Sequence, residues 1–224
     1  MATVIGASIE SLKADVLEMM VQAKIAISES VLSLDDRDTD RAQCVIHQDQ
    51  RIDTMEREIE KKCLELLEGR IGGKALRTVA ATYKIIGDVE RIGDYGVAIA
   101  RVTLNVANKP VMSNALGIIR MSEITSGMLQ ACIDSYGGKS SLDMDRVFKD
   151  DDEVDRLYND IFVNSFTSIL HEPKIITNVF YTVTAGRAME RIGDHITDIA
   201  ERIHFIDTGE IIRRKEPVNI PDFP

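Results

Sequence analysis

The sequence predicts an all-α protein built as two tandem, pseudo-symmetric three-helix bundles with six long helices. Three observations support this fold class. Apolar residues recur at helical spacing along nearly the whole chain, no segment shows the strict alternation of a half-exposed strand, and one helical pattern occurs twice. Five prolines, no tryptophan and only 5% aromatic residues also argue against β-sandwiches and barrels. Long helices joined by short connections pack antiparallel into bundles.

Helix-breaking residues divide the chain into six predicted helices. Apolar residues seven apart, such as Val45, Ile52 and Ile59, give a helix one buried face. Glycine pairs, prolines and polar runs disfavour continued helix. Such breaks occur at residues 34–38, 69–73, 108–110, 137–138 and 171–173. The predicted helices therefore cover residues 5–34, 37–69, 74–107, 112–136, 142–171 and 174–208.

A repeat relates the two halves of the chain. The sequence Glu-Arg-Ile-Gly-Asp at 90–94 recurs unchanged at 190–194, and an acidic helix precedes each copy. The order of helix, acidic helix and Glu-Arg-Ile-Gly-Asp helix thus occurs twice, which indicates a duplicated unit. We predict one bundle at residues 1–109 and a second at residues 110–224.

The composition limits the classes of function. The chain has 224 residues, with 27 basic and 37 acidic side chains, so its formal net charge is −10. This balance argues against a nucleic-acid binder, because phosphate contacts need clustered Lys and Arg. Three widely spaced cysteines argue against a disulfide framework and favour a reducing compartment. With no recognisable signal peptide and no apolar run of about 18 residues, we expect a cytoplasmic protein with no membrane span.

Pairs of acidic residues four apart are the candidate site residues. Side chains at this spacing share one face of a helix, where like charges destabilise the helix by roughly 0.2–0.5 kcal/mol per pair. The pairs recur on two helices of each repeat, so something must offset the repulsion. The candidate metal ligands are Asp49, Asp53, Glu90 and Asp94 in the first half, and Asp151, Asp155, Glu190, Asp194 and Asp198 in the second.

Two interpretations of these carboxylates stay open. In the first, neighbouring arginines such as Arg91 and Arg191 neutralise them in ordinary exposed ion pairs. In the second, the acidic pairs of adjacent helices converge on a cation. Donors that are all oxygen suit hard cations such as Mg²⁺, Ca²⁺, Mn²⁺ or iron.

Several neighbouring residues carry separate expectations. Gly93 and Gly193 are expected to permit close helix packing and not phosphate binding, because no strand precedes them. Asp88, two residues before Glu90, should point away from that pair. His195 is expected to be a polar surface residue.

A catalytic role has little support in the sequence. No nucleophile stands beside a base, and no phosphate-binding or dinucleotide-binding loop is present. Glu201 and His204 form one ExxH motif, whereas a ferritin-like di-iron centre needs two. We predict a protein that is not an enzyme. The alternatives are a carboxylate-bridged metal store or di-metal enzyme, and a metal-free helical adaptor.

The segments DVERIGDYGVAIAR at 88–101 and AMERIGDHITDIAE at 188–201 resemble the paired signatures of the PhoU family of phosphate-uptake regulators. The segment at 45–67 and the run from His171 to Asp194 also resemble that family. The family often has Asn four residues after the motif's Asp, whereas this chain has Ala98 and Asp198. The second site is therefore expected to have an extra carboxylate, and the first to be weaker.

The resemblance implies a function. It implies two three-helix bundles whose E(D)xxxD motifs hold metal cations, with iron, magnesium, manganese or zinc as candidates. It implies negative regulation of phosphate uptake and of the phosphate-starvation response. The implied partners are a membrane sensor histidine kinase and the ATPase of the phosphate ABC transporter, and the implied assembly is a homodimer.

Overall fold

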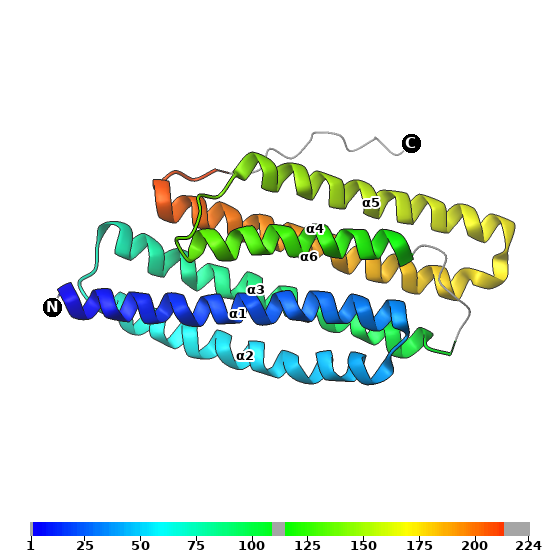
Figure 1. Ribbon diagram of the computed structural model, residues 1–224, viewed down its shortest axis with the longest axis horizontal. Helices are drawn as coiled ribbons and strands as arrows, with labels where there is room; N and C mark the ends of the chain where they lie inside the picture. Colours follow the sequence, from blue (N-terminus) through cyan, green and yellow to red (C-terminus); the bar gives the residue numbers. More distant parts are fainter. Residues whose placement is uncertain (1, 109–114, 213–224) are drawn as a thin grey trace.

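The structure is a computed structural model that describes residues 2–108 and 115–212. Within these ranges the chain forms helices and connecting turns, with no strand (Figure 1). The six long helices are α1 (Ala2–Asp36), α2 (Thr39–Glu68), α3 (Gly73–Val106), α4 (Ala115–Tyr136), α5 (Met144–His171) and α6 (Ile176–Thr208). A short 3-10 turn, Pro173–Ile175, joins α5 to α6. The all-α prediction with six helices is confirmed.

The breaks between helices fall close to the predicted positions. The helix predicted at 37–69 is observed as Thr39–Glu68, and that predicted at 142–171 as Met144–His171. The predicted boundary between the bundles, at 109–110, and the predicted start of the fourth helix at 112 lie outside the described residues. None of the described helices combines the length and the apolar character needed to cross a membrane.

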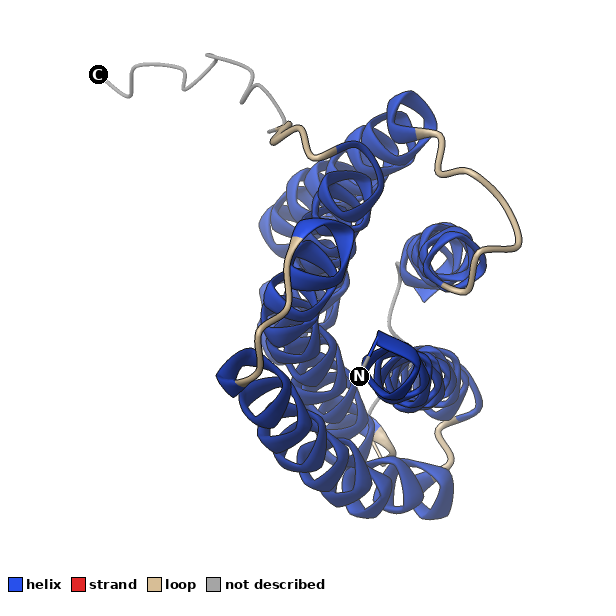
Figure 2. Ribbon diagram, turned by 90° about the vertical axis from the view of Figure 1, so that its left-hand side faces the viewer, coloured by secondary structure: helices blue, strands red, loops and turns tan. Residues whose placement is uncertain are grey.

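The helices form two layers. Seen from one end, α2, α3, α6 and α5 stand side by side in a curved layer, and α1 and α4 lie against its inner side (Figure 2). α1 packs on α2 and α3, while α4 packs on α5 and α6. The two sets of three helices meet mainly where α3 lies along α6, a contact called here the α3–α6 seam.

One hydrophobic core extends through both sets of helices. It contains fully buried residues from the first half, such as Ile27 and Ile85, and from the second half, such as Cys132 and Met189. α3 and α6 bury residues on most of their circumference, because each packs against its own bundle and against the other across the seam. The Glu-Arg-Ile-Gly-Asp motifs therefore lie on the two helices that are held most firmly.

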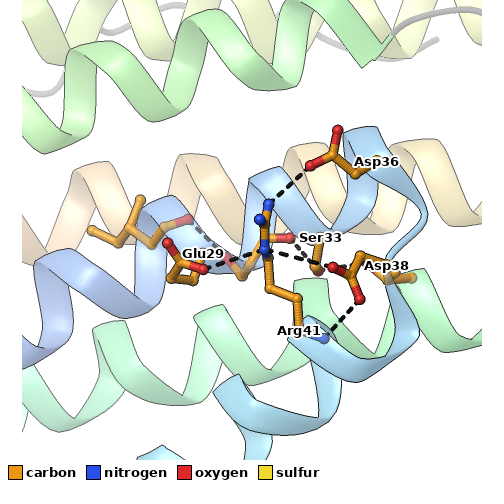
Figure 3. Close-up of polar contacts among 8 residues, drawn as sticks. Glu29, Ser33, Asp36, Asp38 and Arg41 are labelled. Atoms are coloured by element: carbon orange, nitrogen blue, oxygen red, sulfur yellow. Dashed lines mark hydrogen bonds and ion pairs between the residues drawn. The ribbon is translucent and has the colours of Figure 1, made fainter.

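The α1–α2 turn illustrates how the helix ends are fixed. Asp38 caps α2, its carboxylate accepting a hydrogen bond of 2.9 Å from the backbone nitrogen of Arg41. The Arg41 guanidinium lies among Glu29, Asp36 and Asp38, with its closest ion pair to Asp36 at 2.9 Å (Figure 3). The Asp38 backbone nitrogen also donates to the Ser33 carbonyl at 2.9 Å. These contacts set the short, sharp reversal between the first two helices.

Candidate metal centre

Three carboxylates of the second half converge between α5 and α6. Asp151 and Asp155 lie on α5, and Asp194 on α6. One carboxylate oxygen from each of these three residues lies within 4.8 Å of the other two. Asp151 is completely buried, and the other two are partly exposed. Three oxygen donors at this separation, one of them shielded from water, suit a hard cation.

Gly193 allows α5 and α6 to come this close. A Cβ atom at position 193 would lie 2.8 Å from Asp151 Oδ1 and 3.4 Å from Val154 Cγ1. The first half repeats the arrangement, since a Cβ at Gly93 would lie 2.7 Å from Asp49 Oδ1. The expectation that these glycines serve close helix packing is confirmed. Each glycine leaves room for the first aspartate of the facing helix.

Glu190 stands next to the second-half cluster. Its side chain is mostly buried, with 13% of its area exposed, and pairs with Arg187 at 2.5 Å and with Arg191 at 3.6 Å. Burial, and next the charge of Asp194, raise the pKa of Glu190. Arg187 and Arg191 lower the pKa of Glu190, but burial and the neighbouring acid outweigh them. The position therefore disfavours the ionised carboxylate.

The four predicted ligands of the first half are neighbours, but they are arranged more loosely. Burial, followed by the charges of Asp53 and Asp94, raises the pKa of Asp49 to about 6. Burial, and next the charge of Asp94, raise the pKa of Glu90, to which Glu56 and Asp53 also contribute. In the part of the chain that the structure describes, no three of these residues form a group as compact as the second-half trio.

Arginines of the repeated motif pair with its aspartates. Arg91 lies 3.2 Å from Asp94, and Arg191 lies 3.0 Å from Asp194. Both pairs join residues three apart on one helix, and Arg91 is largely exposed. Local ion pairing is thus present at both motifs, and in the second half it occurs beside the compact group of carboxylates.

Asp198, expected to add a carboxylate to the second site, groups instead with Asp88 and His195 across the α3–α6 seam. His195 Nδ1 lies 3.1 Å from Asp88 Oδ1, and an Arg202 guanidinium nitrogen lies 2.9 Å from Asp88 Oδ2. The His195 ring stacks on Tyr95 of α3. Burial, and next the charge of Asp88, raise the pKa of Asp198.

Sequence reasoning missed this cluster. Asp88 points away from Glu90 as expected, but it meets α6, and His195 is mostly buried where a surface residue was expected. The available signal was an asymmetry of the repeat: Asp88 corresponds to Ala188 in the second copy. A buried acid present in only one copy indicates a partner that only the other half can supply.

Comparison with known proteins agrees with the duplicated architecture. A PhoU domain matches residues 16–103 and again residues 118–203. The Caulobacter vibrioides phosphate-specific transport system accessory protein PhoU homolog is 33% identical, over 95% of this chain and 93% of that protein. The Rhizobium meliloti homolog of the same name is 30% identical, over 86% of this chain and 82% of its own length.

Two solved structures share the fold. The crystal structure of PhoU from Pseudomonas aeruginosa has a TM-score of 0.86 and 27% identity, covering 92% of this chain and 99% of that one. The phosphate transport system regulatory protein PhoU from Streptococcus pneumoniae has a TM-score of 0.84, covering 93% of this chain and 99% of its own. At 21% identity, the latter supports the fold alone. With two matching domains and relatives alike over most of its length, the chain belongs to the PhoU family.

Proposed function

We propose that the protein is a non-enzymatic negative regulator of phosphate uptake and of the phosphate-starvation response. Support comes from family membership and from relatives named as accessory proteins of the phosphate-specific transport system. In this proposal it acts in the cytoplasm as a homodimer. Its partners are the membrane sensor histidine kinase and the ATPase of the phosphate ABC transporter.

We further propose that its carboxylates hold metal cations. The observation that carries this proposal is the convergence of Asp151, Asp155 and Asp194 to within 4.8 Å. Glu190 completes the second-half set, and Asp49, Asp53, Glu90 and Asp94 form the first. All donors are oxygens, which favours iron, magnesium or manganese over zinc. Asp198 is left out, because it groups with Asp88 and His195.

A bound cation would act by joining two helices. The second-half donors come from α5 and α6, so a cation shared between them would neutralise their mutual repulsion and fix the relative position of the two helices. Asp194 is adjacent in sequence to His195, which contacts α3 of the other half. A shift of α6 at the metal centre would therefore also move His195 and change its contact with Asp88 of α3.

Elemental analysis of protein purified without chelator tests the metal proposal. We expect bound metal in the wild type and its loss in a variant carrying Asp94→Ala and Asp194→Ala. Glu65→Ala is the matched control, because it removes an exposed carboxylate of α2 whose ion pair is with Lys61, at 3.9 Å. Unchanged metal content in the double variant would show that the assigned residues are not the ligands.

The regulatory proposal has a separate test. We expect deletion of the gene to raise expression of a phosphate-starvation reporter in phosphate-rich medium, and the wild-type gene to restore repression. If the reporter stays silent after deletion, negative regulation is wrong. Complementation with the Asp94→Ala, Asp194→Ala gene then shows whether repression needs the carboxylates.

The ion pairs Arg91–Asp94 and Arg191–Asp194 favour a second candidate, a metal-free adaptor whose acidic stripes are neutralised internally. The two candidates differ in the elemental analysis. Regulation by a protein that contains no metal would support the adaptor.

A further inference from the structure

An exposed apolar surface lies where α5 ends and α6 begins, at the right-hand end of the molecule in Figure 1. Six large apolar side chains on these two helices are exposed by between 41% and 83% of their area. They define what is called here the α5–α6 apolar surface: Phe162, Val163, Phe166, Leu170, Ile176 and Phe180.

A groove runs beside these residues. It has a volume of about 610 Å³ and lies between α5, α6 and the neighbouring part of α3. Phe166 of α5, Phe180 of α6, and Tyr95 and Ala98 of α3 are among the residues that line it. Arg187, the charged residue among the described side chains that line it, is already held by Glu190 and lies over the Tyr158 ring. The groove is thus almost free of unbalanced charge.

The internal repeat shows that the fold does not require apolar side chains at half of these six positions. Aligning Asp49 with Asp151 places Glu60, Lys61 and Glu68 of α2 opposite Phe162, Val163 and Leu170 of α5. The same bundle architecture is therefore charged at these three positions in the first half and apolar in the second, whereas the position of Phe166 is apolar in both, with Leu64 as its counterpart. Apolar side chains gathered at exposed positions are costly in water and indicate an interaction surface.

The exposed apolar area is close to the area that one partner buries in a specific interface. A phenylalanine side chain has about 150–250 Å² of surface, so the three phenylalanines, exposed by 41%, 51% and 66%, present roughly 300 Å². Val163, Leu170 and Ile176 add a comparable amount. The total approaches the ~800 Å² per partner that a stable complex buries, before the groove walls are included.

We propose that two copies of the protein associate through the α5–α6 apolar surface. A twofold interface needs a self-complementary patch, in which one feature of each copy fits another feature of its partner. Here a ridge of contacting rings, Phe162 and Phe166 with centroids 4.6 Å apart, lies beside a groove. Low charge at the contact matters, because two chains of net charge −10 repel each other. This inference rests on the proposed homodimer and is independent of the metal centres and of negative regulation.

Sedimentation equilibrium of the full chain in excess chelator tests the proposal. We expect the wild type to be in a monomer–dimer equilibrium that shifts toward dimer as salt concentration rises, because salt screens the repulsion. Combining Phe166→Glu with Phe180→Glu should weaken dimerisation by about 100-fold or more. Leu170→Glu alone should weaken it too, and this residue is 83% exposed, so the change cannot disturb the core.

Leu64→Glu is the matched control. Leu64 is the α2 counterpart of Phe166 and is similarly exposed, at 48% against 51%. The Leu64→Glu substitution should therefore leave dimerisation unchanged. A monomeric wild type would overturn both the proposed homodimer and this interface. A dimer that needs metal, a dimer that Phe166→Glu with Phe180→Glu leaves intact, or a dimer equally weakened by Leu64→Glu would overturn the interface alone. A wild type that dimerises only after removal of residues 213–224 would assign the surface to that segment and would also overturn it.

Discussion

Gly193 of α6 faces Asp151 of α5 so closely that a Cβ atom there would lie 2.8 Å from Asp151 Oδ1. Gly93 and Asp49 repeat the relationship in the first half, at 2.7 Å. The glycine of the repeated motif and the first aspartate of the facing helix thus form one structural unit. The unit brings carboxylate oxygens from two helices into a single site.

Gly193→Ala should destabilise the protein and displace the Asp151 carboxylate. Alanine normally stabilises a helix by roughly 0.5–1 kcal/mol relative to glycine. Here the added methyl group meets a carboxylate with no exposed area, so we expect a net loss of about 1–2 kcal/mol in the free energy of unfolding. Urea denaturation measures it. Gly127→Ala is the control, since its Cβ meets nothing within 4 Å and should stabilise α4. Equal stabilisation by both changes would contradict the packing role.

The charge on Asp49 should make the metal-free protein less stable as pH rises. Its pKa is about 6 in the folded protein against an ordinary 3.8, so the folded state binds the proton more tightly. Protonated Asp49 therefore adds to the free energy of unfolding. This contribution is complete below about pH 4 and is lost as pH rises through 6. After screening at this partly exposed site, the contribution to the free energy of unfolding should amount to about 1 kcal/mol.

Asp49→Asn should remove that part of the pH dependence in denaturation curves recorded with chelator between about pH 4 and 7. Glu65→Gln, at an exposed position of the same helix, should leave the profile unchanged. An unaltered profile in Asp49→Asn would mean that burial and the nearby acids do not raise the pKa of Asp49.

Arg202 should stabilise the α3–α6 seam far more than a surface arginine stabilises its helix. The Arg202 and Asp88 side chains are only 26% and 12% exposed. Arg202→Met leaves the Asp88 charge poorly compensated and should cost about 2 kcal/mol, measured by thermal or chemical unfolding. Arg120→Met, whose pair with Glu123 is largely exposed, should cost less than about 0.5 kcal/mol. Similar losses in the two variants would argue against a structural role for the seam cluster.

The two carboxylate sites should differ in metal affinity. The second half brings three donors within 4.8 Å, and the first half has no equally compact trio among its described residues. A ligand at about 100 times its Kd stabilises a protein by about 2.7 kcal/mol. In a manganese titration followed by thermal unfolding, Asp194→Ala should therefore lose more of the metal-induced rise in Tm than Asp94→Ala. A larger loss in Asp94→Ala would reverse the assignment of the tighter site.

The sequence by itself determined the helices, their order and the pairing of acidic residues. Helix formation and amphipathic spacing are local properties, so the breaks near Gly69 and Pro173 could be placed within a few residues. The four-residue spacing put Asp151 and Asp155 on one helix face, because residues four apart must share a face. Whether the helix carrying Asp194 packs beside them stayed one of two open interpretations of the sequence, and the structure shows that it does.

Only the tertiary structure decided what happens between the halves. Asp88, His195 and Arg202 are distant in sequence, and they meet because α3 lies along α6. The same packing groups Asp198 with Asp88 and His195, and not with Asp151, Asp155 and Asp194. Spacing along one helix fixes the face on which a side chain lies, whereas the burial of that face depends on which helix packs against it. Which helix packs there depends on the packing of the whole hydrophobic core.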